Sequence, residues 1–289
     1  MDKRRQIILI PAGGLGNRMR AIASGVALAN KTGRALKIIW QKDNGLAAEF
    51  SNLFSTDNLP FDFKHVSGLI YSFIYDVPRK KNLYLTTLTS LFDRRSRIHH
   101  ISNKENNYLF DQPLEDKINN QKRDVIILSG SQFYPFPDSL LRSIFRPHAE
   151  VRKVIENILC NQKPSIGMHI RRTDNLQSIQ QSPIDLFKSV IEKELKEDRT
   201  VKIYVATDSD EVKNELKTIY GDSIITNNNT ADRSSLSGMR EGLAEMLILA
   251  SCKQIYGSFW SSFSEISSMI GGVPLTILST SKKLIHSTG

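Results

Sequence analysis

The sequence predicts an α/β protein with two Rossmann-like domains, and two features of its 289 residues carry this prediction. Short apolar runs typical of buried strands alternate with segments of helical periodicity, which is the pattern of parallel sheets covered by helices. Polar residues or glycines follow the apolar runs, as expected where strands end. We place the domain boundary near residue 147, giving domains at 1–147 and 148–289 that are each long enough to bury a core.

The apolar pattern assigns the individual elements. In the first domain it predicts a strand at 6–11, a helix at 16–32, and strands at 35–40 and 124–129. The segment 50–122 is poorly patterned, so we expect loops with scattered helix there. The second domain is more regular: helices are expected at 147–161, 183–197, 208–221, 239–252 and 262–271, and strands at 164–170, 200–207, 222–226, 253–259 and 274–278.

Composition indicates a soluble globular protein, with 40% hydrophobic and 24% charged residues. No apolar run approaches the ~18 residues of a membrane-spanning helix, and the run at 7–11 is too short for a signal peptide. Cys160 and Cys252 are too few for a disulfide framework. We therefore expect a cytoplasmic location, including the inner face of the membrane.

The net charge of +9 is concentrated in the first half. Residues 1–150 hold 22 Lys and Arg against 14 Asp and Glu, whereas residues 151–289 hold 17 against 16. Basic runs at 78–81 and 93–100 are typical of solvated loops. The alternative is attraction to an anionic partner, namely a membrane surface, an acidic glycan or nucleic acid. Peripheral contact with an anionic membrane is the favoured form of that alternative, and nucleic acid the least favoured.

The first motif is a glycine turn between the first strand and helix, "PAGGLGNRM" at 11–19. It is not a dinucleotide fingerprint, because Met19 occupies the third glycine position and no acid follows the second strand before Asp43. The turn still offers backbone amides, with Asn17 and Arg18, that could approach a phosphate or a sugar. A turn that merely needs glycine accounts for the same residues.

The second motif, "GMHIRRTDN" at 167–175, follows a predicted buried strand. Strand ends in α/β sheets face the ligand crevice. An arginine offers a planar fork of donors to phosphate oxygens, so Arg171 could stabilise a departing diphosphate. The structural alternative is an ion pair between Arg172 and Asp174.

The third motif, "YVATDSDEVKNEL" at 204–216, is explained by Asp208 and Ser209 as helix caps. Asp208 and Asp210 are spaced as cation ligands, but no third oxygen ligand accompanies them, so we expect no metal. The fourth motif spans 241–272. Its Glu245 lies on an apolar helix, where burial with a specific partner is expected, and a carboxylate can accept both N1–H and the N2 amine of guanine.

After the following strand, a serine-rich segment at 258–264 opens the last helix. Hydroxyls and free amides at a helix N-terminus form an anion site. This segment completes the fourth motif.

Together and in order, these motifs resemble the fucosyltransferase superfamily, whose members use GDP-fucose. "GGLGNRM" resembles the GGLGNQM opening of α-1,2-fucosyltransferases, and "LSGSQFYPFPDSLLRSIFRP" (128–147) is similar to their segment before the domain crossover. "HIRRTD" (169–174) matches the H-x-R-R-x-D motif, and with "SPIDLF" (182–187) it resembles α-1,6-fucosyltransferases. "ATDS" and "ASCKQIYGSFWSSFSE" fit two later motifs, so only about 50–122 is uncovered.

The resemblance implies a GT-B fold, with an N-terminal acceptor-side domain, a C-terminal GDP-sugar-binding domain and a cleft between them. It further implies an inverting, metal-independent transferase that needs no cofactor besides the donor GDP-fucose and acts on a glycan or glycolipid. Arg171 would hold the β-phosphate, and Asp174 is the candidate base. The other donor-binding residues it implies are Gly14, Gly16, Asn17, His169, Asp208, Glu245, Ser261 and Ser262.

Several residues depart from the family pattern. Arg18 replaces a glutamine, Asn175 replaces a lysine, and Ile179 occupies the position of a proposed carboxylate base. A one-residue shift also leaves open which serine reaches phosphate. Two alternatives therefore stay open: another nucleotide sugar as donor, or a degenerate, non-catalytic binding protein.

Overall fold

The computed structural model describes residues 5–43, 45–66, 96–100, 113–173, 176–229 and 231–280, with backbone only for 96–100. The chain divides into two compact units, residues 1–146 and 147–289. Within the described residues, no helix has both the length and the apolar character needed to span a bilayer.

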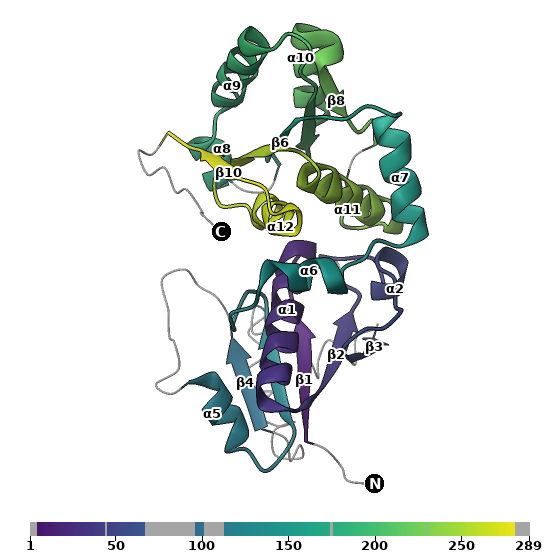
Figure 1. Ribbon diagram of the computed structural model, residues 1–289, viewed down its shortest axis with the longest axis vertical. Helices are drawn as coiled ribbons and strands as arrows, with labels where there is room; N and C mark the ends of the chain where they lie inside the picture. Colours follow the sequence, from purple (N-terminus) through teal and green to yellow (C-terminus); the bar gives the residue numbers. More distant parts are fainter. Residues whose placement is uncertain are drawn as a thin grey trace. The chain divides into compact units, whose positions relative to one another are not determined.

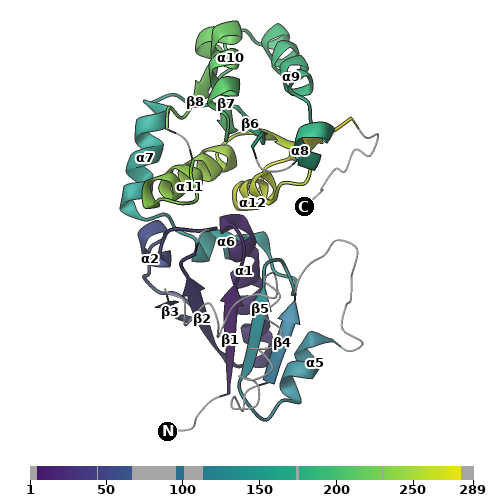
Figure 2. The same cartoon turned by 180° about the vertical axis from the view of Figure 1, so that it is seen from behind.

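The first unit is built on a parallel five-stranded sheet in the order β3-β2-β1-β5-β4. Helix α1 (Leu15–Thr32) packs along one face of this sheet, with the short helices α5 (Leu114–Asn119) and α6 (Asp138–Ile144) beside it (Figure 1). Seen from behind, the strands lie in front of α1 (Figure 2). The strands are β1 (Gln6–Pro11), β2 (Ala35–Gln41), β3 (Asp62–Val66), β4 (Ser96–His100) and β5 (Val125–Ser129), and a short helix, α2 (Phe50–Leu53), follows β2.

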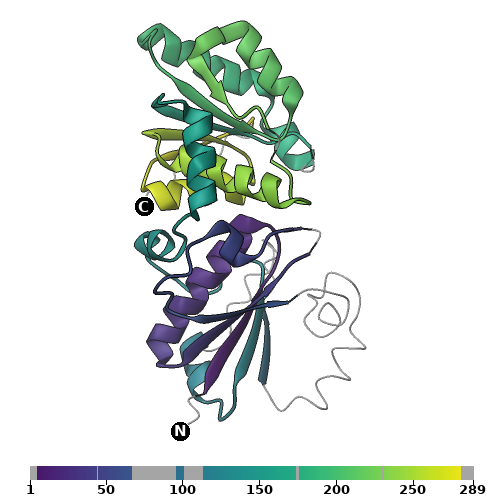
Figure 3. The same cartoon turned by 90° about the vertical axis from the view of Figure 1, so that its right-hand side faces the viewer.

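Glycines set how closely α1 approaches the sheet along which it runs (Figure 3). A Cβ at Gly25 would lie 2.8 Å from a methyl group of Leu9 of β1, so a side chain there would force Leu9 to shift. Gly33 ends the helix with φ 67°, in the left-handed region where a side chain is unfavourable. Gly33 therefore lets the chain turn directly from α1 into β2.

The second unit contains another parallel sheet, ordered β10-β9-β6-β7-β8. Helices α9 (Ile184–Glu197) and α10 (Asp210–Tyr220) cover one face; α7 (Ala149–Leu159), α11 (Leu236–Ala250) and α12 (Ser262–Gly271) cover the other (Figures 1 and 2). The strands are β6 (Ile166–Ile170), β7 (Ile203–Thr207), β8 (Ile224–Thr226), β9 (Gln254–Ser258) and β10 (Leu275–Leu278), and the short helix α8 (Leu176–Gln181) comes after β6.

Alternation along the central strands divides the second core into two layers. In β7, Val205 packs toward α9 and α10, whereas Tyr204 and Ala206 pack toward α7 and α11. In β6, Met168 packs on the α9 side, while Gly167 approaches α11 so closely that a Cβ there would lie 2.8 Å from Leu249. A sheet buried on both faces explains why these strands read as continuous apolar runs.

The predicted α/β class with parallel sheets is confirmed, and the regular elements lie within a few residues of their predicted positions. The segment 50–122 was predicted wrongly as lacking strands, because it contributes β3 and β4. Both are edge strands, and β3 ("DFKHV") exposes alternate polar residues, so neither carries the apolar run of a central strand. Helices α6 and α8 were also missed.

Candidate functional site

The strand order of the second unit defines a ligand crevice. Strand β6 lies between β7 and β9, and the chain reverses its direction of strand addition between β6 and β9. Open parallel sheets bind ligands outside the carboxyl ends of the strands at such a switch point. Arg171 directly follows β6, Asp208 follows β7, and Ser261 lies between β9 and α12. The fold therefore brings three predicted site residues to one edge of one sheet.

Ser258 fastens β6 to β9 at that edge. Its fully buried hydroxyl donates to the carbonyl oxygen of His169 over 3.2 Å and accepts the backbone N–H of Arg171 over 3.0 Å. The backbone on both sides of Ile170 is thereby held by the neighbouring strand. The sequence placed Ser258 in the serine-rich segment but did not single it out.

Asp208 holds the next two residues. Its carboxylate accepts the backbone N–H of Arg172 over 2.7 Å, and both the N–H and the hydroxyl of Thr173, over 3.3 and 2.7 Å. The prediction that Asp208 caps the following helix is wrong, because Ser209 alone accepts the N–H of Val212. The three consecutive amides after β6 are thus all bound by side chains at the carboxyl ends of the neighbouring strands, Ser258 at the end of β9 and Asp208 after β7.

The structure shows a partner for the Arg172 side chain other than Asp174, with which an ion pair was considered. Its guanidinium donates to the carbonyl oxygen of Ser182 over 2.8 Å, which ties the turn to the segment before α9. Burial lowers the pKa of Arg172, and the charge of Asp208 opposes that shift. Asp174, the predicted partner of Arg172 and candidate base, lies outside the described residues, as does Asn175.

His169 is a buried, neutral ring. It stacks on Phe263 of α12 with 4.7 Å between ring centroids and 21° between planes. Burial, reinforced by the charge of Arg171, lowers the pKa of His169 to about 3. Its Nδ1 has no hydrogen-bond partner among the described residues. A neutral imidazole with a free nitrogen can accept or donate one hydrogen bond to a ligand, but it carries no charge at neutral pH.

Glu245 is the most unusual group of the unit. It is 3% exposed, and its Oε1 has no partner within the described part of the chain. Burial raises the pKa of Glu245 to about 8, although the charge of Lys213 opposes the shift. The expected specific partner is therefore missing for this oxygen, and buried polar atoms without partners are uncommon and costly. Such an atom is suited to a ligand.

The packing of α11 on β6 places Glu245 near the crevice. Helix α11 precedes a strand parallel to β6, so it runs antiparallel to β6. Leu249 packs over Gly167, and Glu245 lies one turn earlier on the same face. One helical turn of 5.4 Å therefore brings Glu245 toward the carboxyl end of β6, where His169 points to the same side of the sheet.

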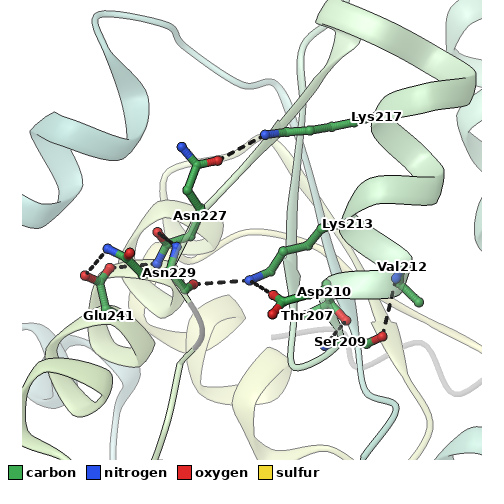
Figure 4. A network of polar contacts seen from close by, with 10 residues as sticks. Thr207, Ser209, Asp210, Val212, Lys213, Lys217, Asn227, Asn229 and Glu241 are labelled. Carbon is green, nitrogen blue, oxygen red and sulfur yellow. Dashed lines mark hydrogen bonds and ion pairs between the residues drawn. The ribbon is translucent and has the colours of Figure 1, made fainter.

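A polar network fastens the segment after β8 beside that helix (Figure 4). Glu241 accepts the side-chain amides of Asn227 and Asn229, over 2.7 and 3.0 Å. Lys213, itself buried, donates to the carbonyl oxygen of Asn229 over 3.1 Å and to Asp210 over 3.0 Å. Glu241, rather than Glu245, is thus the carboxylate with protein partners. This network could not be predicted from the sequence, because Asn227 and Asn229 lie in a polar segment that is typical of a turn.

The start of α12 offers further donors. Ser261 is its N-cap and accepts the N–H of Phe263 over 3.3 Å, and Ser262 is the first, half-buried residue of the helix. Trp260, between β9 and this helix, adopts φ 55°. The phosphate-binding role of both serines stays a prediction.

The glycine turn of the first unit differs from its prediction in one respect. Arg18 is fully buried over the ring of Trp40; it donates to the carbonyl oxygens of Gly13 and Gln41 and forms an ion pair with Asp43 over 2.8 Å. Burial lowers its pKa, and Asp43 opposes the shift. Arg18 therefore supports the turn and is not available to a phosphate.

The other predicted residues of that turn lie at the carboxyl end of β1. Gly14 is the N-cap of α1 without a side-chain cap, Gly16 is buried, and Asn17 is half-buried beside Gly13. Their contact with a donor stays a prediction. The basic run at 78–81 lies outside the described residues, as do the side chains of the run at 93–100.

A groove of about 670 Å³ lies elsewhere in the second unit, along the edge strand β8. Lys202, Lys217 and Thr226 line it, together with residues from the ends of α7 and α10. None of the predicted site residues lines this groove. The predicted site is instead the crevice at the ends of β6 and β9.

The structure is similar to solved structures of other proteins, although its sequence matches no known family. No family model matches the sequence, and no curated protein matches it. Among solved structures, NodZ α-1,6-fucosyltransferase soaked with GDP-fucose is 16% identical and aligns with a TM-score of 0.60 over 99% of this chain and 100% of that one. The fold is that of the fucosyltransferases.

Two further structures carry the same fold. A mutant of Arabidopsis thaliana FUT1 in complex with GDP is 19% identical, with a TM-score of 0.61 over 96% of this chain and 72% of that one. POFUT1 in complex with GDP is 12% identical, with a TM-score of 0.56 over 96% and 99% of the two chains. The predicted GT-B type, with two Rossmann-like units, agrees with this fucosyltransferase fold.

Proposed function

We propose that the protein is a glycosyltransferase that moves fucose from GDP-fucose to a hydroxyl group of a glycan or glycolipid. The observations that carry this proposal are Arg171 at the carboxyl end of β6 and, on the helix packed over that strand, the buried Oε1 of Glu245, which has no hydrogen-bond partner among the described residues. The fold supports it, since structures with this fold were obtained with GDP or GDP-fucose.

Glu245 would select the base. When ionised, its carboxylate accepts two hydrogen bonds, which match the N1–H and N2 amine of guanine. Uracil lacks such a paired donor edge. Because the carboxyl is buried and holds its proton up to a pH of about 8, guanine would bind as that proton leaves.

Arg171 would hold the diphosphate together with the amide groups at the start of α12, near Ser261 and Ser262. A guanidinium fork suits phosphate oxygens, and a helix N-terminus favours negative charge. We propose that these groups stabilise the charge that develops on GDP, so that a divalent cation is not required.

The proposed reaction inverts the sugar. The acceptor oxygen attacks C1 of fucose from the face opposite the diphosphate, and the bond between C1 and the β-phosphate oxygen breaks with its electrons moving to GDP. The acceptor proton passes to a base, for which Asp174 is the candidate. Strong stabilisation of the leaving group reduces the demand on that base.

Fucosyl transfer from GDP-fucose tests the proposal. The protein is incubated with GDP-fucose and a panel of oligosaccharides and glycolipids in the presence of EDTA, and GDP release and fucosylated product are both quantified. We expect product from GDP-fucose and none from a UDP-sugar. Transfer from a UDP-sugar alone would identify a different donor, and the absence of both transfer and GDP binding would leave a non-catalytic binding protein.

Ser258 offers a test of how Arg171 is positioned. Replacing Ser258 by alanine removes both contacts that fix the backbone around Ile170, so we expect kcat to fall about tenfold and stability to fall by about 1 kcal/mol. Ser267→Ala is the matched control, because this buried serine bonds only within its own helix, to Phe263. An equal loss of kcat in both variants would contradict a positioning role for Ser258.

A further inference from the structure

Trp260 combines two features that folding alone does not favour. Its φ of 55° lies in the left-handed region, which large side chains rarely adopt. Its side chain is 43% exposed, and among the described residues only Leu176 and Ile219 are comparably exposed large apolar residues. Strained non-glycine residues concentrate at ligand-binding sites, where surrounding contacts hold them in place.

Neighbouring contacts impose this conformation. Ser258 on one side and Ser261 on the other are buried and hydrogen-bonded. The N–H of Phe259 donates to the hydroxyl of Ser182 over 2.7 Å, and the rings of Phe259 and Trp260 meet edge to face with 6.2 Å between centroids. Trp260 is therefore presented by a fixed turn at the rim of the crevice.

The position of Trp260 suggests its ligand, and this step rests on the proposed function. Trp260 directly precedes the N-cap of α12, where the diphosphate would bind. The donor sugar is attached to the β-phosphate, and the acceptor sugar must approach the same C1 atom. Both sugars would therefore lie next to the diphosphate. Pyranose rings expose a C–H-rich face that packs on flat aromatic rings, and the indole N–H can bond a hydroxyl.

We propose that Trp260 is a sugar-binding residue whose indole packs against a pyranose ring at the transfer site. Both the donor fucose and the acceptor sugar present a pyranose face, so either of them could supply the ring that contacts Trp260. The base and the diphosphate do not need this contact, so GDP affinity is independent of Trp260.

Fluorescence tests the contact directly, because the chain has only two tryptophans and Trp40 is fully buried. Acrylamide quenching of Trp260 is measured with GDP, with GDP-fucose, and with GDP plus an acceptor glycan, and Trp260→Phe supplies the baseline. We expect GDP-fucose or the acceptor to shield Trp260 at least twofold more than GDP does. Equal quenching in all three states, with GDP bound, overturns the proposal and leaves the proposed function intact.

Substitutions test the energetic role. Glycine accepts φ 55° without strain, so we expect Trp260→Gly to retain or raise the melting temperature while the KM for donor or acceptor rises about tenfold and the Kd for GDP changes less than twofold. Trp260→Phe should restore most of the loss. The control is Ile219→Ala, an exposed apolar residue in the last turn of α10, away from the crevice.

The pattern of KM values identifies the sugar. A higher KM for GDP-fucose alone assigns the contact to the donor, and a higher KM for the glycan alone assigns it to the acceptor. Unchanged KM values in Trp260→Gly overturn the proposal. If the wild-type protein binds no GDP, the proposed function itself is wrong, and this result is distinguishable from failure of the Trp260 proposal.

Discussion

Replacing Arg171 by alanine is expected to lower kcat for fucosyl transfer by about a thousandfold, the size of effect seen when a positioned charge that stabilises a leaving group is removed. The backbone of Arg171 is fixed by Ser258 and its neighbours by Asp208, so little stability should be lost. Steady-state kinetics at saturating GDP-fucose measure the change.

Two further variants sharpen this result. Arg171→Lys keeps the charge but loses the planar fork, so its kcat should fall between that of the wild type and that of Arg171→Ala. Arg199→Ala is the control, because Arg199 is exposed before β7, at the opposite edge of the sheet. Wild-type turnover in Arg171→Ala would remove Arg171 from the mechanism.

Replacing Glu245 by glutamine is expected to weaken GDP binding by about one to two orders of magnitude, because a carboxamide cannot accept both guanine donors and the mismatch is buried. Glu211→Gln, an exposed substitution on α10, is the control. Calorimetric Kd values for GDP, UDP and ADP would report both affinity and selectivity. Undiminished preference for GDP in Glu245→Gln would show that another group reads the base.

The pH dependence of binding follows from the same residue. Because the pKa of Glu245 is about 8 before binding and guanine requires the ionised form, GDP affinity should rise about tenfold from pH 6 to 7 and about fivefold from pH 7 to 8. Binding at pH 7 should release close to one proton, which appears as a binding enthalpy that differs between phosphate and Tris buffers. Glu245→Gln should lose both effects.

Much of the fold was predictable because central strands of parallel sheets are buried on both faces. The runs that became β6 and β7 are therefore apolar throughout, and the polar residue after each strand marks the crevice edge. The edge strand β3 could not be recognised, because polar residues that are exposed or half-buried alternate along it and no continuous apolar run remains. Helix boundaries differ from the predicted ones where the capping residue sets the first helical residue. Ser209 is the N-cap of α10, so this helix begins at Asp210 and not at Asp208.

The site was predictable only in part. Residue type and position at a strand end sufficed to select Arg171, and a carboxylate on an apolar helix selected Glu245. His169 was selected only through the resemblance to fucosyltransferases. Roles that depend on partners distant in sequence could not be read: Arg18 pairs with Asp43 and stacks on Trp40, more than twenty residues away. The bonds from Asp208 to the amides after β6 join residues more than thirty positions apart.

In the proposed function, the second unit binds GDP through Glu245 and Arg171. Isothermal titration of the wild type with GDP, UDP and ADP in the presence of EDTA, repeated with Arg171→Ala and Glu245→Gln, tests it most directly. We expect GDP-selective binding without a divalent cation, weakened in both variants and no longer selective in Glu245→Gln. Absence of GDP binding by the wild type, or equal binding of all three nucleotides, would contradict it.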